Sequence, residues 1–159
     1  MKKVKNKKGV LLIVLIFVMV LIVVWIYCHS PLFYRYTIFT NDKSIAMRDD
    51  IVSYNKRKGK IELDECNIQF EFSGLDTLWD IEVKEETQLT FITDVNVQGE
   101  YKLVIVCPDQ SILQLQCKAK QSIFLEKGSY KIRMVGVEAK GEIDIKIVNA
   151  ESVEIIPFN

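Results

Sequence analysis

Residues 66–72 read Cys-Asn-Ile-Gln-Phe-Glu-Phe, and this alternation of apolar and polar side chains decides the fold class. Successive side chains of a β-strand point to opposite faces of a sheet, so a period of two is typical of a strand that buries one face. The apolar set from Cys66 to Phe72 then faces a core, and the polar set faces solvent. The segment therefore predicts a half-buried β-strand.

The same alternation recurs towards the C-terminus, in residues 79–83, 101–107, 113–117, 130–134, 143–147 and 153–155. Turn-forming residues separate some of these runs, at Ser73-Gly74 and at residues 108–111. A series of about nine or ten short strands at regular intervals is typical of an antiparallel β-sandwich or jelly roll. We therefore expect an all-β domain of that kind over residues 61–159. The second face of residues 101–107, with Val104 and Val106, is apolar too, so we expect this strand to be central and covered on both sides.

Residues 29–60 have a mixed pattern, and we expect them to form a juxtamembrane segment and the first elements of the outer domain. Residues 33–39 predict a first strand. Asn41-Asp42 can cap a short helix over residues 44–52, because both side chains accept hydrogen bonds from the first free N–H groups of a helix. Residues 56–60, Lys-Arg-Lys-Gly-Lys, predict a basic turn.

The N-terminal part of the chain contains a long apolar run in which every side chain from Val10 to Tyr27 is apolar or aromatic. A helix of that length spans about 27 Å, close to the hydrocarbon thickness of a bilayer. We therefore expect one transmembrane helix over residues 10–28, with the lipid bilayer as its partner. The residues that we expect to anchor this helix in the membrane include Val10, Leu11, Leu12, Phe17, Leu21, Trp25 and Tyr27.

The charges beside this run predict its orientation. The tail of residues 1–9 carries five lysines, and residues 1–28 contain no Asp or Glu. Lysine and arginine near a membrane span stay on the cytoplasmic side, so we expect a cytoplasmic N-terminus and an extracytoplasmic C-terminal domain. The lysines that set this topology are Lys2, Lys3, Lys5, Lys7 and Lys8.

Three other fates of the N-terminal segment are open. A secretory signal peptide could be cut after Ser30, although Pro31 would follow the bond. A lipoprotein could begin at Cys28. Cleavage after Gly9, as in type IV prepilins, would give a minor pilin-like subunit, but Val14 stands where most pilins carry a glutamate.

Composition limits the partners and the chemistry of the outer domain. Without the five tail lysines, 16 basic residues stand against 21 acidic ones, a net charge of −5, which disfavours nucleic acid and anionic wall polymers as partners. The cysteines Cys66, Cys107 and Cys117 show no metal-ligand spacing, and His29 is the single histidine of the chain, so we expect neither a metal site nor a cofactor. We expect the three cysteines to be buried free thiols on the apolar side of their strands, with a bridge from Cys66 to one of the other two as the alternative.

Candidate catalytic patterns are weak. Residues 53–56 match S-x-x-K, but the companion S-D-N and K-T-G elements are missing. Many carboxylates are available to a carbohydrate-active hydrolase, yet strand alternation already explains their positions. Exposed aromatic rings could bind a glycan, but Trp79, Tyr101 and Tyr130 lie on the apolar side of their strands and Tyr54 alone does not. We therefore expect no enzyme activity, and a glycan ligand has no support in the sequence.

Three segments carry a resemblance to known proteins. They are residues 73–79, Ser-Gly-Leu-Asp-Thr-Leu-Trp; residues 99–106 leading into Pro108-Asp109; and residues 125–136, Leu-Glu-Lys-Gly-Ser-Tyr-Lys-Ile-Arg-Met-Val-Gly. Over residues 60–150 this pattern resembles small extracytoplasmic β-sandwich domains of Gram-positive membrane proteins and lipoproteins. Those domains have no assigned activity, so the resemblance implies a fold and an envelope location only.

The sequence combines an apolar anchor, an acidic outer domain and no catalytic signature. Together these features predict a single-pass envelope protein whose β-sandwich is a non-enzymatic binding module. We expect its partner to be another envelope or membrane protein, reached in one docking mode by strand addition at a sheet edge. The alternatives are the minor pilin-like subunit and a carbohydrate-active hydrolase or glycan-binding domain.

Overall fold

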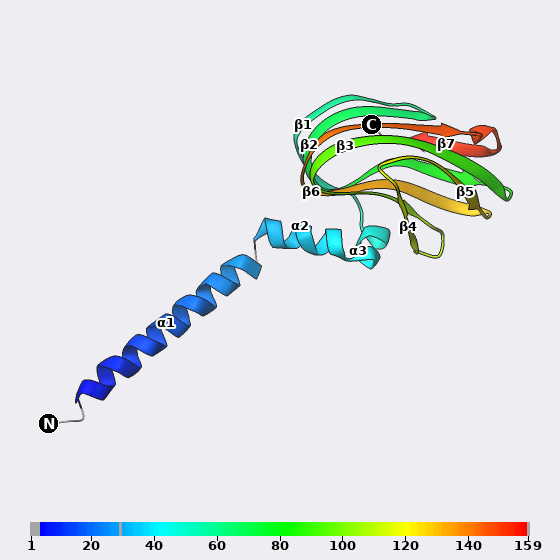
Figure 1. The fold of residues 1–159 in the computed structure, drawn as a ribbon. Helices are drawn as coiled ribbons and strands as arrows, with labels where there is room; N and C mark the ends of the chain where they lie inside the picture. The colour runs from blue at the N-terminus through cyan, green and yellow to red at the C-terminus, as the bar shows by residue number, and fades with distance from the viewer. Residues whose placement is uncertain (1–3, 29, 159) are drawn as a thin grey trace. The chain divides into compact units, whose positions relative to one another are not determined.

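The computed structural model describes residues 4–28 and 30–158. The chain forms two compact units that meet between Tyr34 and Arg35. The first contains helix α1 (Val4–Cys28), and the second contains the sheet, helix α3 (Asp42–Met47) and the second half of helix α2 (Pro31–Thr40). Figure 1 shows the helices and strands of both units.

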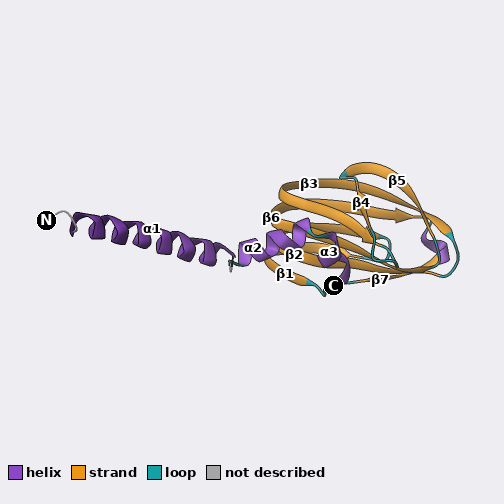
Figure 2. Ribbon diagram, turned by 90° about the horizontal axis from the view of Figure 1, so that it is seen from below, coloured by secondary structure: helices purple, strands orange, loops and turns teal. Residues whose placement is uncertain are grey.

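The second unit is built on one antiparallel sheet, which confirms the all-β class. Its strands are β1 (Ile51–Ile61), β2 (Glu65–Val83), β3 (Thr87–Val106), β4 (Ile112–Leu115), β5 (Lys118–Leu125), β6 (Gly128–Val148) and β7 (Val153–Pro157). They are ordered β1-β2-β6-β3-β4, and β7 also pairs with β2 and β5 with β3. Figure 2 shows β1 and β7 on one side of the sheet and β4 and β5 on the other. A short 3-10 helix, Ala150–Ser152, precedes β7.

The three central strands are long and bend at mid-length, so the sheet folds over itself into two leaves (Figure 1). Leaf A consists of β1, residues 65–72 of β2, 139–148 of β6, 87–98 of β3, and β5. Leaf B consists of β7, residues 75–83 of β2, 128–136 of β6, 100–106 of β3, and β4. The prediction of nine or ten short strands was therefore wrong, because several predicted strands are halves of one long strand.

Each bend coincides with a backbone irregularity. The register shifts between Phe72 and Gly74 in β2 and between Gln98 and Glu100 in β3. Gly74 and Gly99 have φ of +129° and +86°, and Glu138 of β6 has φ of +51°. Extra residues and left-handed conformations of this kind bend a strand and increase its twist. Ser73-Gly74 was predicted as a chain reversal, and it is a bend within a continuous strand.

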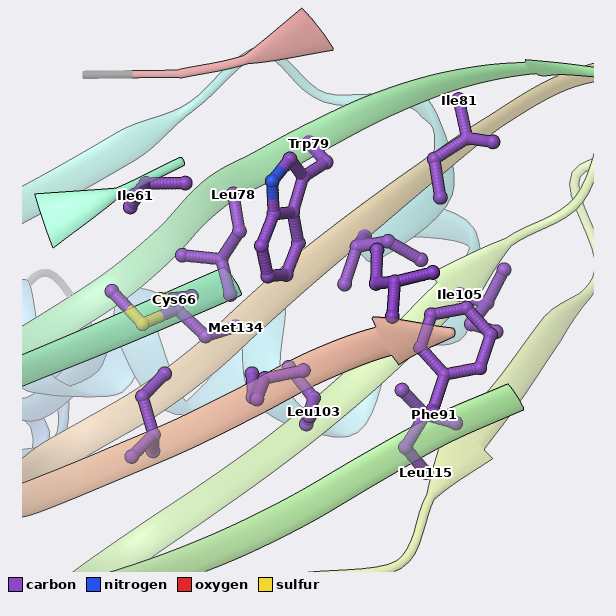
Figure 3. Packing of buried hydrophobic residues seen from close by; sticks show 14 of the residues in the cluster. Ile61, Cys66, Leu78, Trp79, Ile81, Phe91, Leu103, Ile105, Leu115 and Met134 are labelled. Atoms are coloured by element: carbon purple, nitrogen blue, oxygen red, sulfur yellow. The ribbon is translucent and has the colours of Figure 1, made fainter. Parts of the chain in front are cut away.

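The main core lies between the two leaves (Figure 3). Phe70 and Phe72 from leaf A meet Tyr101 from leaf B, and the rings of Phe70 and Tyr101 stack with centroids 5.8 Å apart. Trp79 is fully buried, and its indole N–H donates to the carbonyl of Glu62 at 2.7 Å. The predicted inward set of residues 66–72 is confirmed, since Cys66, Ile68, Phe70 and Phe72 are all buried.

The segment before the sheet differs in part from the expectation. Residues 33–39 were predicted as a strand and lie in helix α2, which begins at Pro31, a residue whose fixed φ suits a first helical turn. The predicted short helix is confirmed as α3, which ends at Met47; the Asn41 side chain accepts from the Ser44 N–H at 3.1 Å. Residues 56–60 were predicted as a turn and lie in strand β1.

Candidate functional site

Helix α1 has the properties of a membrane span. Residues Gly9–Tyr27 are long and apolar enough to cross a bilayer, and none of them is buried by the rest of the chain. All seven predicted anchor residues lie on this helix and are exposed: Val10, Leu11, Leu12, Phe17, Leu21, Trp25 and Tyr27. Such an apolar surface is stable in lipid and unfavourable in water.

The lysines of the tail lie before this span. Lys5, Lys7 and Lys8 belong to α1 in sequence, and Lys2 and Lys3 lie outside the described residues. His29 also lies outside them. The orientation that these lysines predict stays a prediction, because it depends on the insertion of the chain.

The outer face of leaf B is occupied by helices α2 and α3. Ile38, Phe39 and Ile45 of the helices pack on three sheet residues, Leu75, Val104 and Val135. The packing of Val104 confirms the expectation that the strand over residues 101–107 is central and covered on both faces. The helix over residues 31–40 that helps to cover it was not expected, because residues 33–39 were predicted as a strand. Val135 extends the apolar run of β6 to both faces in the same way, and this signal was missed.

Two cations fix these helices to leaf B. Arg133 is 4% exposed, and its guanidinium donates to the carbonyls of Ile45 and Arg48 at the end of α3. It also donates to the Thr77 hydroxyl at 3.1 Å and lies 3.7 Å from the Asp50 carboxylate. Burial lowers the pKa of Arg133, and Asp50 opposes that shift by stabilising the charged form.

The second cation is Lys102, whose ammonium donates to the Phe39 carbonyl near the end of α2 at 3.0 Å and lies 4.6 Å from the Phe39 ring centroid. Positive charges at helix C-termini satisfy free carbonyls and offset the helix dipole. Leaf B is thus covered by the segment that follows α1 in sequence.

The outer face of leaf A, by contrast, is free of covering elements among the described residues. Its outward positions fall in cross-strand rows, because paired residues of antiparallel strands project to the same side. One row is Lys60, Asn67, Asp144, Asp94 and Lys118; the next is Lys58, Gln69, Glu142 and Asn96; the third is Lys56, Glu71, Lys140 and Gln98. We call this surface the leaf A face.

The polar groups of the leaf A face bind one another. Asn67 donates to Asp144 at 3.1 Å, and Gln69 donates to Glu142 at 3.2 Å. Lys118 pairs with Asp94 at 3.5 Å and Lys140 with Glu71 at 3.3 Å. Two adjoining shallow depressions of about 330 and 280 Å³ share Asn96 and Glu142 in their lining. The face is therefore hollowed and polar.

A buried polar pair joins the two leaves on the side of β1. The Tyr54 hydroxyl of β1 donates to the carboxylate of Asp76, which is 8% exposed, and the Tyr54 ring stacks on Phe72. The Arg57 guanidinium lies 5.4 Å from the Tyr54 ring centroid. Burial raises the pKa of both Tyr54 and Asp76, although the Tyr54 hydroxyl and Arg57 hold the Asp76 pKa back.

Replacing Asp76 with asparagine is expected to change the free energy of unfolding, relative to the wild type, more favourably at pH 7 than at pH 3. The folded Asp76 has a raised pKa, so the folded state is most favoured while the carboxyl is protonated and loses stability as pH rises above the ordinary carboxyl pKa. Asparagine accepts the Tyr54 hydrogen bond without titrating. Denaturant unfolding of both proteins at the two pH values measures the difference, and an equal effect of the substitution at both would contradict the expectation.

Tyr54 is consequently not a free aromatic platform for a glycan. Tyr130 is buried, and the Tyr101 hydroxyl is buried without a hydrogen-bond partner among the described residues. Ser53 and Lys56, the ends of the S-x-x-K match, both lie in β1 and not on a helix. No group of three or more His, Cys, Asp or Glu side chains in the described part of the chain is placed to hold a metal ion.

The prediction for the cysteines holds in part. All three are free thiols. Cys66 is buried, but Cys107 is half-buried and Cys117 is exposed, because β4 ends at Leu115 and the alternation of that strand does not extend to residue 117. Comparison of the sequence with protein-family models and with curated proteins gave no match.

Proposed function

We propose that this chain is a single-pass protein of the cell envelope, with its N-terminus in the cytoplasm and its β-sandwich outside, where it acts as a non-enzymatic binding module. The exposed apolar helix α1 supports the anchor, and the five tail lysines support the orientation. The resemblance of residues 60–150 to Gram-positive envelope domains is consistent with that location.

The leaf A face is the proposed binding surface, and one observation carries this choice. The outer face of leaf B is covered by α2 and α3 through a second core, a buried contact of Arg133 and a partly buried contact of Lys102. Leaf A offers a five-strand-wide surface that none of the described helices covers. A module held by one face presents the other to its partner.

Labelling of the Cys117 thiol tests on which side of the membrane the β-sandwich lies. In a Cys28→Ser, Cys107→Ser protein, Cys117 is the reactive thiol, since burial raises the pKa of the Cys66 thiol to about 12 and leaves it protonated at neutral pH. A membrane-impermeant maleimide is expected to label Cys117 in intact cells with a single membrane. A thiol placed in the tail by Asn6→Cys, in a protein whose Cys28, Cys107 and Cys117 are replaced with serine, keeps all five tail lysines and should react only after permeabilisation. Labelling of Cys117 only after permeabilisation would reverse the topology.

The same chemistry tests occupation of the leaf A face. Asn96→Cys lies at the centre of this face, and Glu82→Cys lies at an exposed position of leaf B. If the face holds an envelope component, Asn96→Cys should react several-fold more slowly in cells than in the purified protein, whereas Glu82→Cys reacts equally in both. If Asn96→Cys, like Glu82→Cys, reacts at the same rate in cells as in the purified protein, a binding role for this face is contradicted.

A further inference from the structure

The charges of the leaf A face are distributed unequally between paired and unpaired groups. Its outward positions carry seven lysines and five carboxylates, namely Lys56, Lys58, Lys60, Lys118, Lys120, Lys140 and Lys146 with Glu65, Glu71, Asp94, Glu142 and Asp144. Four of the carboxylates accept a bond from a lysine or an amide on a neighbouring strand. Two of the lysines are taken up in these pairs. Five lysines therefore have no carboxylate partner among the described residues, and the face carries a net charge of +2 from seven lysines and five carboxylates.

Three of the unpaired lysines form a regular line on the edge strand β1. Lys56, Lys58 and Lys60 are exposed, and none has a carboxylate within ion-pair distance among the described residues. Alternate residues of a strand share a face and lie about 6.7 Å apart along it. The line thus offers cations at a constant repeat along one direction, with the exposed Arg57 between them on the other side of the strand.

A regular line of cations matches a linear polymer with regularly spaced anions. Each lysine that neutralises a phosphate releases a counterion, and several such contacts in line give appreciable affinity at low salt. The outer domain as a whole carries a net charge of −5, so this basic line is a local feature of an acidic domain. That contrast orients an anionic chain towards β1 and repels it from the other surfaces.

The composition of the face also selects among anionic polymers. Single-stranded nucleic acids are held by bases stacked on aromatic side chains. Phe124, at the end of β5, is the one aromatic residue among the described outward positions of this face, and it pairs with Gln88, far along the strands from the β1 lysines. Asn67 and Gln69 lie opposite Lys60 and Lys58 on the neighbouring strand. Asn96 and Gln98 lie on the same face on β3, which β2 and β6 separate from β1. Amide groups of this kind suit hydroxyl groups.

We propose that the leaf A face binds a linear extracellular polymer of phosphodiester-linked polyols, with its phosphates on Lys56, Lys58 and Lys60 and its hydroxyls on the neighbouring amides. This assignment rests on the proposed function, because it names the component that the outward binding module holds. The partner is inferred here from the local charge of the β1 lysines, whereas the net charge of the outer domain pointed away from an anionic partner.

The test compares two triple variants of the full chain in a neutral detergent, with synthetic poly(glycerol phosphate) as the probe. One variant is Lys56→Gln, Lys58→Gln, Lys60→Gln. The control is Lys43→Gln, Lys84→Gln, Lys127→Gln, which removes the same charge from exposed lysines outside the face. Both keep the basic tail, so the contribution of the tail to binding cancels when they are compared.

The β1 variant is expected to bind about tenfold more weakly or worse at low salt, and the slope of log K against log salt should become shallower by about 2 to 3. The control variant should stay within about twofold of the wild type. Equal weakening of both variants, or no weakening of either, would overturn the proposal and leave the β1 lysines as guards against strand pairing at a sheet edge.

Two further probes distinguish a polyol phosphate from the other anionic polymers, namely nucleic acid and acidic protein segments. Oligothymidylate and poly-glutamate of similar charge are expected to bind more weakly than poly(glycerol phosphate) to the wild type. Tighter binding of oligothymidylate would overturn the polyol assignment in favour of nucleic acid, and tighter binding of poly-glutamate would favour an acidic protein segment. The maleimide experiment on Cys117 is independent of all these outcomes, so the outward location can hold while the polymer assignment fails.

Discussion

Replacing Gly74 with alanine is expected to lower the free energy of unfolding of the sandwich by roughly 3 kcal/mol or more. Gly74 has φ of +129°, a conformation that side-chain-bearing residues rarely adopt. A Cβ atom at this position would lie 1.9 Å from the Ile51 carbonyl oxygen and 2.9 Å from its carbon. Both atoms belong to the backbone of β1, so relief requires that β1 move away from β2.

The substitution therefore acts on the bend that creates the two leaves. Trp79 is buried in the core between them, and its fluorescence in a Trp25→Phe background reports unfolding in denaturant. Ser53→Ala is the matched control, since Ser53 is exposed on the facing strand and pairs with Ser73 beside Gly74. We expect the control to change stability by less than about 0.5 kcal/mol. A Gly74→Ala protein as stable as the control would show that the bend tolerates a side chain.

Replacing Arg133 with methionine is expected to lower stability by about 3 kcal/mol and to release α3 from leaf B. Methionine keeps the apolar bulk but removes every donor of the guanidinium. The carbonyls of Ile45 and Arg48 would then lose their donor, and Asp50 would lose its nearby positive charge. Unsatisfied buried polar groups account for most of this expected loss.

Lys131→Met provides the comparison on the same strand. Lys131 lies two residues from Arg133 and pairs with Asp80 at 3.1 Å, but its side chain is 41% exposed, and we expect a loss of less than about 1 kcal/mol. Amide hydrogen exchange distinguishes the two effects. Exchange in residues 42–51 should accelerate strongly in Arg133→Met and little in Lys131→Met. Unchanged exchange in Arg133→Met would mean that the apolar contacts of Ile38, Phe39 and Ile45, together with Lys102, hold the helices without Arg133.

Periodicity was sufficient for the class of the fold because burial of one strand face is a local property. Residues 66–72 alternate in sequence and alternate in burial in β2. The Asn41 cap was also readable, because a capping side chain contacts N–H groups only a few residues away. Residues 33–39 were misassigned, since their aromatic and β-branched content favours a strand, whereas the segment is helical and packs Ile38 and Phe39 on the sheet.

The candidate site was beyond sequence reasoning for a different reason. Lys58 and Asp144 are 86 positions apart, and they share a face only because β1, β2 and β6 pair in a particular register. Net charge, the one electrostatic quantity that a sequence provides, pointed away from anionic partners. It contains no information about which charges are paired across strands.

The sequence by itself determined that this protein has one helix apolar enough for a membrane and one sheet-built domain, because both follow from side-chain patterns over short distances. Only the tertiary structure decided how many strands there are, since long strands that bend at Gly74 and Gly99 resemble pairs of short ones in sequence. It also decided that leaf B holds α2 and α3 while leaf A stays free. That division depends on contacts such as Arg133 to Ile45, which pairing of distant segments creates and no local pattern encodes.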